Sequence, residues 1–85
     1  MKFEITGNEV LGISENGKKV ASVSFEKTGD GIYNIYHTYV DESMRGKGVA
    51  SDMIEYTVKH LKSIGAVKVH ATCSFAQHWL EKNNI

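Results

Sequence analysis

Residues 44–54 combine glycines, cations and the expected start of a helix, a combination that binds anions. Gly46 and Gly48 let the backbone turn tightly and bring its N–H groups close to a ligand, because neither has a side chain in the way. Arg45 and Lys47 add positive charge to the same loop. The first N–H groups of a helix have no partner within it, and the helix dipole adds partial positive charge there. The stretch therefore predicts a phosphate-binding loop.

Other phosphate motifs fit this loop less well. A P-loop requires Gly-x-x-x-x-Gly-Lys-Ser/Thr, but Asp41 stands at the position of the first glycine and Gly48 at that of the hydroxyl residue. A dinucleotide-binding fingerprint is nearly met at Gly46, Gly48 and Ser51. It also requires an acidic residue about twenty positions later, and residues 66–72 contain none. A glycine-rich turn with two solvated cations is the remaining alternative.

Arg45, Gly48 and Ala50 match a signature, Arg/Gln-x-x-Gly-x-Gly/Ala, of the GNAT superfamily of acetyl-CoA-dependent acyltransferases. From about residue 32 to residue 83 the sequence resembles the short, one-domain branch of that superfamily. The segments that carry this likeness are His37-Thr38-Tyr39-Val40 and Thr72-Cys73-Ser74-Phe75. The resemblance implies that the loop binds the pyrophosphate of coenzyme A. The implied binding residues are Val40, Arg45, Gly46, Lys47, Gly48, Val49, Ala50 and Ser51.

Chain length, charge balance and cysteine count limit which classes of protein this sequence can belong to. A chain of 85 residues supports one core, so we expect a single domain over residues 1–85. Acidic and basic residues balance, which disfavours binding to nucleic acid or to an anionic membrane. The single cysteine cannot form an intrachain disulfide, and residues 1–10 alternate in polarity unlike a signal peptide. We therefore expect a cytoplasmic monomer with no membrane partner.

The N-terminal half alternates apolar and polar residues, as strands buried on one face do. This pattern predicts strands over residues 2–6, 10–14 and 20–26, and Asn16-Gly17 is typical of a hairpin turn. The longer run 32–40 is apolar or aromatic on both faces, which indicates a central strand. Strict alternation would place Ile35, His37 and Tyr39 on one face and Tyr36 and Val40 on the other. The strands up to residue 40 should form an antiparallel meander.

Residues 49–64 change to a helical period and end at Gly65, a typical helix stop. A strand over 66–73 follows, and a right-handed crossover should make it parallel to strand 32–40. Ser74 and Gln77 read as a capping box that opens a short last helix. We therefore predict a mixed α+β, GNAT-like fold of antiparallel N-terminal strands, a parallel strand–helix–strand unit and a C-terminal helix. The apolar face of the first helix consists of Ala50, Met53, Ile54, Thr57, Val58, Leu61 and Ile64.

Cys73 is the first candidate catalytic residue. In the superfamily an amine attacks the thioester directly, and many members place a tyrosine as the leaving-group acid in the helix after the second parallel strand. Leu80 stands at that position here and cannot donate a proton. Cys73 lies just before the start of that helix, where free amides lower a thiol pKa. The short branch has cysteine at this place, which implies a leaving-group acid or a transient acyl acceptor. A small buried apolar residue is the alternative.

His37 is the second candidate, because it lies three residues before Val40 and imidazole is the side chain most often used as a general base. It suits a general base, and a buried histidine with a satisfied hydrogen bond is the alternative. The four histidines and one cysteine lack the spacing of metal ligands, so we predict no metal site.

The resemblance implies a small acyltransferase that uses acetyl-CoA as acyl donor and an amine or peptide as acceptor, whose identity the sequence does not specify. A coenzyme A-binding or acyl-CoA-binding module without transferase activity is the alternative. It is motivated by Thr6-Gly7-Asn8-Glu9, which connects two expected strands where larger relatives have helices that wall the acceptor site. A nucleic-acid-binding α+β domain is disfavoured by the neutral charge.

Overall fold

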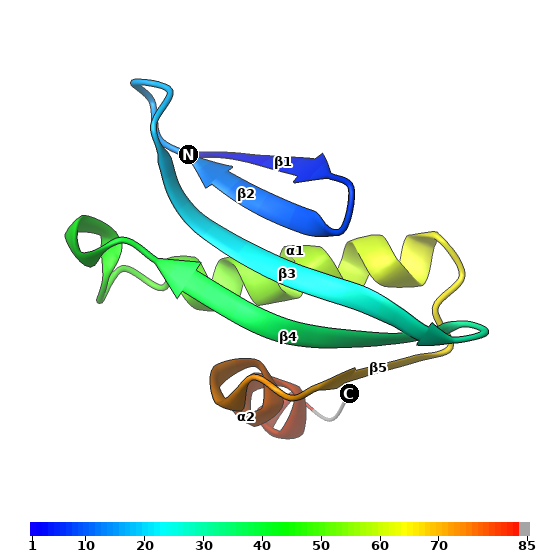
Figure 1. Ribbon diagram of the computed structural model, residues 1–85. Coiled ribbons are helices and arrows are strands. Elements are labelled where there is room, and N and C mark those ends of the chain that lie inside the picture. The colour runs from blue at the N-terminus through cyan, green and yellow to red at the C-terminus, as the bar shows by residue number, and fades with distance from the viewer. Residues whose placement is uncertain (84–85) are drawn as a thin grey trace.

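A computed structural model describes residues 1–83 and shows one five-stranded sheet with its strands in sequence order (Figure 1). The first four strands pair antiparallel, and the fourth and fifth pair parallel. The strands are β1 (Lys2–Thr6), β2 (Glu9–Ile13), β3 (Lys19–Gly29), β4 (Ile32–Val40) and β5 (Lys68–Ala71). The helices are the 3-10 turn η1 (Glu42–Met44), α1 (Val49–Ser63) and α2 (Ser74–Lys82). This arrangement confirms the predicted α+β fold.

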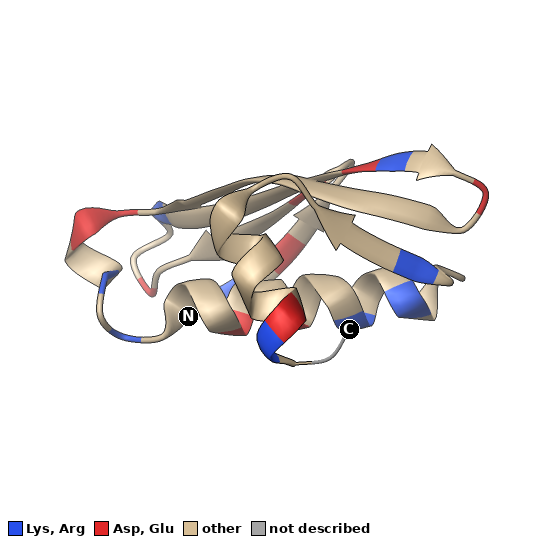
Figure 2. Cartoon of the chain, turned by 90° about the horizontal axis from the view of Figure 1, so that it is seen from below, with Lys and Arg blue, Asp and Glu red and all other residues tan. Residues whose placement is uncertain are grey.

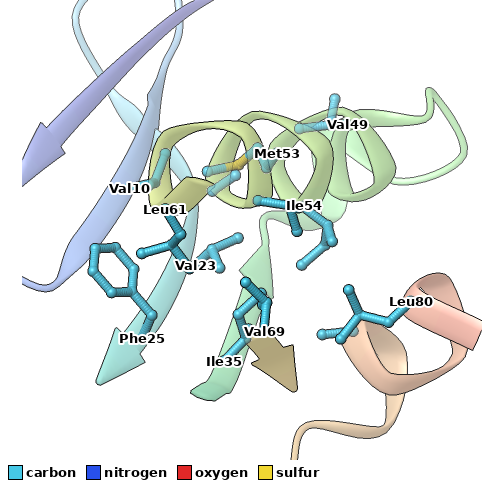
Figure 3. Close-up of a cluster of buried hydrophobic side chains, with 13 residues drawn as sticks. Val10, Val23, Phe25, Ile35, Val49, Met53, Ile54, Leu61, Val69 and Leu80 are labelled. Carbon is cyan, nitrogen blue, oxygen red and sulfur yellow. The ribbon is translucent and has the colours of Figure 1, made fainter. Parts of the chain in front are cut away.

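Both helices lie on the same side of the sheet, as Figure 2 shows, and the opposite face is left open. The core fills the space between α1 and the sheet, where Met53, Ile54 and Leu61 pack near Val23 and Ile35 (Figure 3). Leu80 and Ala76 of α2 join the same cluster, which fixes α2 beside the first helix. No helix within residues 1–83 is long and apolar enough to cross a membrane.

The helix α1 follows the predicted period through Leu61 and then departs from it. Met53, Ile54, Thr57, Val58 and Leu61 are buried, as expected. Ile64 is 52% exposed, so its assignment to the buried face is wrong. The helix ends at Ser63, and Gly65 has φ +102°, so the chain turns away before another helical turn can bring Ile64 inward.

The strand β4 contains one residue more than its partner, a β-bulge at Tyr36. Ser24 pairs with His37 but Phe25 pairs with Ile35, so Tyr36 has no partner on β3. Beyond this point Thr38 is opposite the buried Val23 and therefore faces the helices. His37 consequently faces the open side of the sheet. Strict alternation, which placed His37 on the face of Ile35, is wrong because the bulge reverses the faces.

The strand β5 is shorter than the predicted 66–73, and its pairing with β4 ends at Ile35 and Ala71. The N–H groups of Thr72 and Cys73 both donate to the carbonyl oxygen of Ile35, at 3.1 and 3.4 Å. The chain therefore leaves the strand where the bulge begins.

The capping box expected at the start of α2 is not formed. Cys73 is the N-cap, without a side-chain capping bond, and Ser74 is already the first helical residue. The N–H of Gln77 donates to the carbonyl oxygen of Cys73 at 2.9 Å, which is the first bond of the helix ladder. The helix thus starts one residue earlier than a capping box at Ser74 requires.

We expect Leu61→Ala to lower the free energy of unfolding by about 2–5 kcal/mol, because Leu61 is fully buried and its truncation leaves a cavity. Ile64→Ala is the matched control and should change it by about 0.5 kcal/mol or less. Urea denaturation followed by circular dichroism measures both. Equal losses would show that Ile64 belongs to the core after all.

Candidate functional site

A cavity of about 400 Å³ lies where β4 leads through η1 into α1. Thr38, Met44 and Phe75 form part of its wall. Lys47 is exposed and does not line it. The remaining predicted coenzyme A-binding residues gather in this lining, namely Val40, Arg45, Gly46, Gly48, Val49, Ala50 and Ser51.

The start of α1 presents free N–H groups to the cavity. The first bond of the helix ladder runs from the N–H of Asp52 to the carbonyl oxygen of Gly48, at 3.1 Å. Gly48 is the N-cap and no side chain caps the helix, so the N–H groups of Val49, Ala50 and Ser51 have no partner from the helix itself. Their positions on the cavity wall make this a candidate anion site.

The glycines of the loop give this site its shape. Gly46 has φ +79° and Gly48 has φ +74°, a region that other residues adopt only with strain. A Cβ atom built on either would meet no protein atom within 4 Å, so the space above the loop is open. Arg45 and Lys47 stand in this loop, a few residues before α1 begins at Val49. Positive charge and open backbone therefore meet at one place.

Asp41 holds the chain between β4 and the loop. Its carboxylate caps η1 by accepting from the N–H of Ser43 at 3.1 Å, and it accepts from the Tyr39 hydroxyl at 3.3 Å. The Ser43 hydrogen bonds hold the pKa of Asp41 below its ordinary value. Desolvation, followed by the Asp41 carboxylate, raises the pKa of Tyr39. The segment that sets the entry to the loop is thus fixed by its own side chains.

Cys73 lies beside Thr38, with 3.4 Å between Sγ and Oγ1. Burial raises the pKa of this thiol, but hydrogen bonds from the Thr38 hydroxyl and from the N–H groups of Ala76 and Phe75 stabilise the thiolate and leave the pKa below its ordinary value. The Thr38 hydroxyl on β4 contributes most to this lowering, and the first N–H groups of α2 add to it, as expected for a cysteine at an N-cap.

His37 and Cys73 lie on different sides of β4. His37 is exposed on the open face, whereas Cys73 is half-buried and contacts Thr38, which faces the helices. Neither lines the cavity, although Thr38 does. Thr38 therefore connects the two candidates, since it follows His37 in the chain and its hydroxyl touches the Cys73 thiol.

Polar side chains cross the open face beside His37. Asn34 is buried, and its Nδ2 donates to Glu26 at 3.3 Å and to the Thr72 hydroxyl at 3.2 Å. The strand register also places Glu9 opposite Ser24, which is opposite His37. The surface around His37 therefore carries two carboxylates. Within residues 1–83, no three His, Cys, Asp or Glu side chains gather as metal ligands.

Sequence reasoning missed three residues of the cavity wall, Thr38, Met44 and Phe75. The bulge at Tyr36 moves Thr38 to the helix face, and nothing in a period-two pattern reveals it. Phe75 carried a usable signal, because it is an apolar residue in the first turn of the expected last helix. In the structure it is 44% exposed. An exposed aromatic ring beside a cavity is typical of a ligand contact.

A strand, a glycine loop and an uncapped helix, built on a mixed sheet with helices on one face, define an α+β protein with a candidate anion site. The family model of the GCN5-related N-acetyltransferases matches residues 2–84. The chain therefore belongs to this family, which confirms the resemblance seen in its sequence. No protein of curated function matches the chain.

Solved structures share the fold. A GCN5-like protein from Staphylococcus aureus is 28% identical, with a TM-score of 0.74, and the match covers 98% of this chain and 80% of that one. A ribosomal-protein-alanine N-acetyltransferase from Brucella melitensis is 18% identical, with a TM-score of 0.72 and coverage of 87% and 57%. An IAA acetyltransferase from Bacillus cereus is 19% identical, with a TM-score of 0.71 and coverage of 88% and 52%. The last two likenesses show the fold alone, and the chain spans little more than half of those proteins.

We expect Thr38→Val to raise the pKa of Cys73, because it removes a hydrogen bond that favours the thiolate while nearly keeping the volume. The rate of alkylation by iodoacetamide against pH, followed by intact mass, should shift its midpoint to higher pH. Thr72→Val is the control, because its hydroxyl bonds to Asn34 and not to the thiol. An unchanged midpoint in Thr38→Val would contradict the assigned role of this bond.

Proposed function

We propose that the protein transfers an acetyl group from acetyl-CoA to an amine acceptor. The observation that carries this proposal is the uncapped start of α1, which opens onto a cavity that Arg45, Gly46 and Gly48 also line. The pyrophosphate of coenzyme A fits this site chemically, since it needs several N–H donors and positive charge at close range. Membership of the family supports the same donor.

The pantetheine arm has a path from this site along β4. The pairing of β4 with β5 stops at Ile35, so the β5 side of residues 36–40 is left without a strand partner. Backbone groups at such an edge bind an amide-containing chain by adding to the sheet. The path passes Val40 and Thr38 and ends near Cys73, with Phe75 on the apolar wall.

The reaction we propose is direct attack of the amine on the thioester of acetyl-CoA. A nitrogen–carbon bond forms, the carbon–sulfur bond breaks, the amine loses a proton and the departing thiolate gains one. His37 suits the base, because its imidazole is exposed on the open face of β4, next in the chain to Thr38 of the cavity wall. Cys73 suits the acid, because a thiol with a lowered pKa gives up its proton more readily. Transient acylation of Cys73 is the alternative for this residue.

The acceptor would approach from the open face of the sheet. His37 faces that side, and the donor cavity lies on the helix side. The short turn between β1 and β2 leaves this face without a covering element, as Figure 1 shows. Glu9 and Glu26 flank the approach and would favour an amine or peptide that carries positive charge.

We expect Gly48→Ala to weaken coenzyme A binding strongly, because its Cβ would project into the phosphate position at a residue with φ +74°. Gly17→Ala is the matched control, with φ +83°, no atom within 4 Å and a place in the β2–β3 hairpin. Both should lose comparable stability from the backbone strain, about 1–2 kcal/mol. Calorimetric titration with coenzyme A separates the two, and equal affinities would show that the phosphate lies elsewhere.

We expect Cys73→Ser to lower turnover by about 10² to 10⁴ while coenzyme A affinity changes little, because serine is a much weaker acid of similar size. His37→Gln should abolish the acidic limb of the pH–rate profile. His70→Gln is the control for loss of a histidine, since His70 lies beside Thr28 at 3.4 Å, and it should keep that limb. If Cys73→Ser and His37→Gln both turn over like the parent, neither residue acts as acid or base, and catalysis rests on the positioning of the two substrates alone.

The alternative function is a coenzyme A-binding module without transfer, which the open acceptor face favours. The two functions separate in one assay, namely release of free coenzyme A from acetyl-CoA with and without a panel of amines and peptides. Release that depends on an acceptor supports the transferase. Binding of acetyl-CoA without such release supports the module.

A further inference from the structure

The strand β1 lies at one edge of the sheet, far from the candidate site. It pairs with β2 on one side, and no strand within residues 1–83 pairs with its other side (Figure 1). The direction of its backbone groups follows from the next ladder. The N–H of Phe25 donates to the carbonyl oxygen of Asn8 at 2.9 Å. Hydrogen-bonded pairs alternate along antiparallel strands, so even-numbered residues of β2 bond to β3 and odd-numbered ones bond to β1.

The register then shows which backbone groups of β1 are used. The odd-numbered residues of β2 are opposite Lys2, Glu4 and Thr6, whose N–H and C=O groups therefore point toward β2. Phe3 and Ile5 direct theirs to the free side of the strand. The edge thus presents a short row of backbone donors and acceptors that another strand can complete.

An apolar strip runs along the helix side of this edge. Phe3 packs edge to face against Tyr56 of α1, with 5.1 Å between the ring centroids. Ile5 is opposite the buried Val10 and so faces the helices, yet it is 39% exposed. Met1 and Tyr56 are also exposed, at 46% and 36%. Apolar surface beside free backbone groups is typical of an edge that receives a strand.

The charges of β1 select one partner and one register. Lys2 and Glu4 share the open face, with 3.5 Å between Nζ and Oε1. A two-fold axis at Phe3, relating two antiparallel β1 strands, places Lys2 opposite Glu4 of the second copy and Ile5 opposite Met1 of that copy. Centring the axis on Lys2 or on Glu4 instead places like charges opposite each other, which is unfavourable. An axis at Phe3 therefore pairs unlike charges on one face and apolar side chains on the other.

We propose that the protein forms a two-fold symmetric dimer in which the β1 strands of two copies pair antiparallel, with Phe3 opposite Phe3. The two Phe3 residues exchange their free backbone hydrogen bonds, and the Tyr56 rings extend the apolar strip below the seam. The chain has no net charge, so two copies do not repel each other. This differs from the monomer expected from the sequence, and it does not depend on the proposed function.

The dimer would join two sheets into one and leave both layers of helices on the same side. The open faces of the two copies then form one continuous surface. The inferred seam involves only β1 and Tyr56, so both candidate coenzyme A sites stay accessible.

Sedimentation velocity at increasing concentration tests the dimer. Because a seam of one short strand per copy is small, the parent should change from monomer to dimer between about 10 μM and 1 mM. A parent that stays monomeric throughout this range overturns the proposal.

Charge reversal tests the register. Glu4→Lys makes the seam wholly positive and Lys2→Glu makes it wholly negative, so each variant alone should self-associate about tenfold more weakly or worse. An equimolar mixture of the two should associate at least as tightly as the parent, because each charge is again opposite its complement. Glu81→Lys is the control, since this exposed residue lies on α2, and it should dimerise like the parent. Circular dichroism shows that each variant is folded.

The outcomes are decisive for the seam. If Glu4→Lys weakens association no more than Glu81→Lys does, or if the mixture of the two reversed chains fails to associate, the β1 pairing is wrong. Calorimetric binding of coenzyme A by the same variants should be unchanged in either case, so failure of the dimer is distinguishable from failure of the proposed function.

Discussion

Tyr36 has no partner on β3, and this extra residue determines what the rest of the sheet can do. A strand alternates its side chains with a period of two, so one inserted residue reverses every face that follows. Thr38 and Val40 turn toward the helices, and His37 turns toward the open side. The pairing with β5 stops at the same level, at Ile35. The bulge and the end of the β4–β5 pairing therefore lie at the same level of the sheet.

The loop after β4 supplies the second part of the candidate site. The chain must turn from a strand that ends at Val40 into a helix that begins at Val49, and it does so through a capped 3-10 turn and two glycines of positive φ. The helix starts without a side-chain cap, although Ser, Thr, Asp or Asn at that position would stabilise it by about 0.5–2 kcal/mol. An anion at the loop would satisfy the same N–H groups. Because no side chain caps α1, its first N–H groups are free to bind an anion, and binding one would stabilise the helix.

The sequence carried most of this information where the signal was local. The glycines, Arg45 and the helix that follows are contiguous, so residue types and spacing pointed to a loop whose residues do line one cavity, and anion binding there stays a prediction. The period of α1 was equally clear through Leu61, because each residue of its buried face repeats one packing environment. Residue types within one loop and the period of one helix can both be read without knowledge of tertiary contacts.

The errors have a common cause, since each depends on where an element ends or shifts. A bulge depends on the pairing of β4 with β3, which the sequence of β4 does not contain. The exposure of Ile64 depends on where α1 ends, and the N-cap of α2 depends on where β5 leaves the sheet. The largest consequence for the candidate site is at His37. A period of two along β4 assigns this residue to the wrong face, because the bulge shifts the register.

The one-sided sheet also divides the proposed chemistry unequally between donor and acceptor. The helix side has a cavity and a loop with free N–H groups, so many contacts are available to a coenzyme A molecule. The open side has the strand surface alone, with His37 and a polar row from Glu26 through Asn34 to Thr72. Asn34 is held there by two hydrogen bonds, so the row is ordered before any acceptor arrives. In the proposed reaction a pocket would therefore recognise the acyl donor and a few fixed side chains the acceptor, and acceptor selectivity would come from charge and reach more than from enclosure.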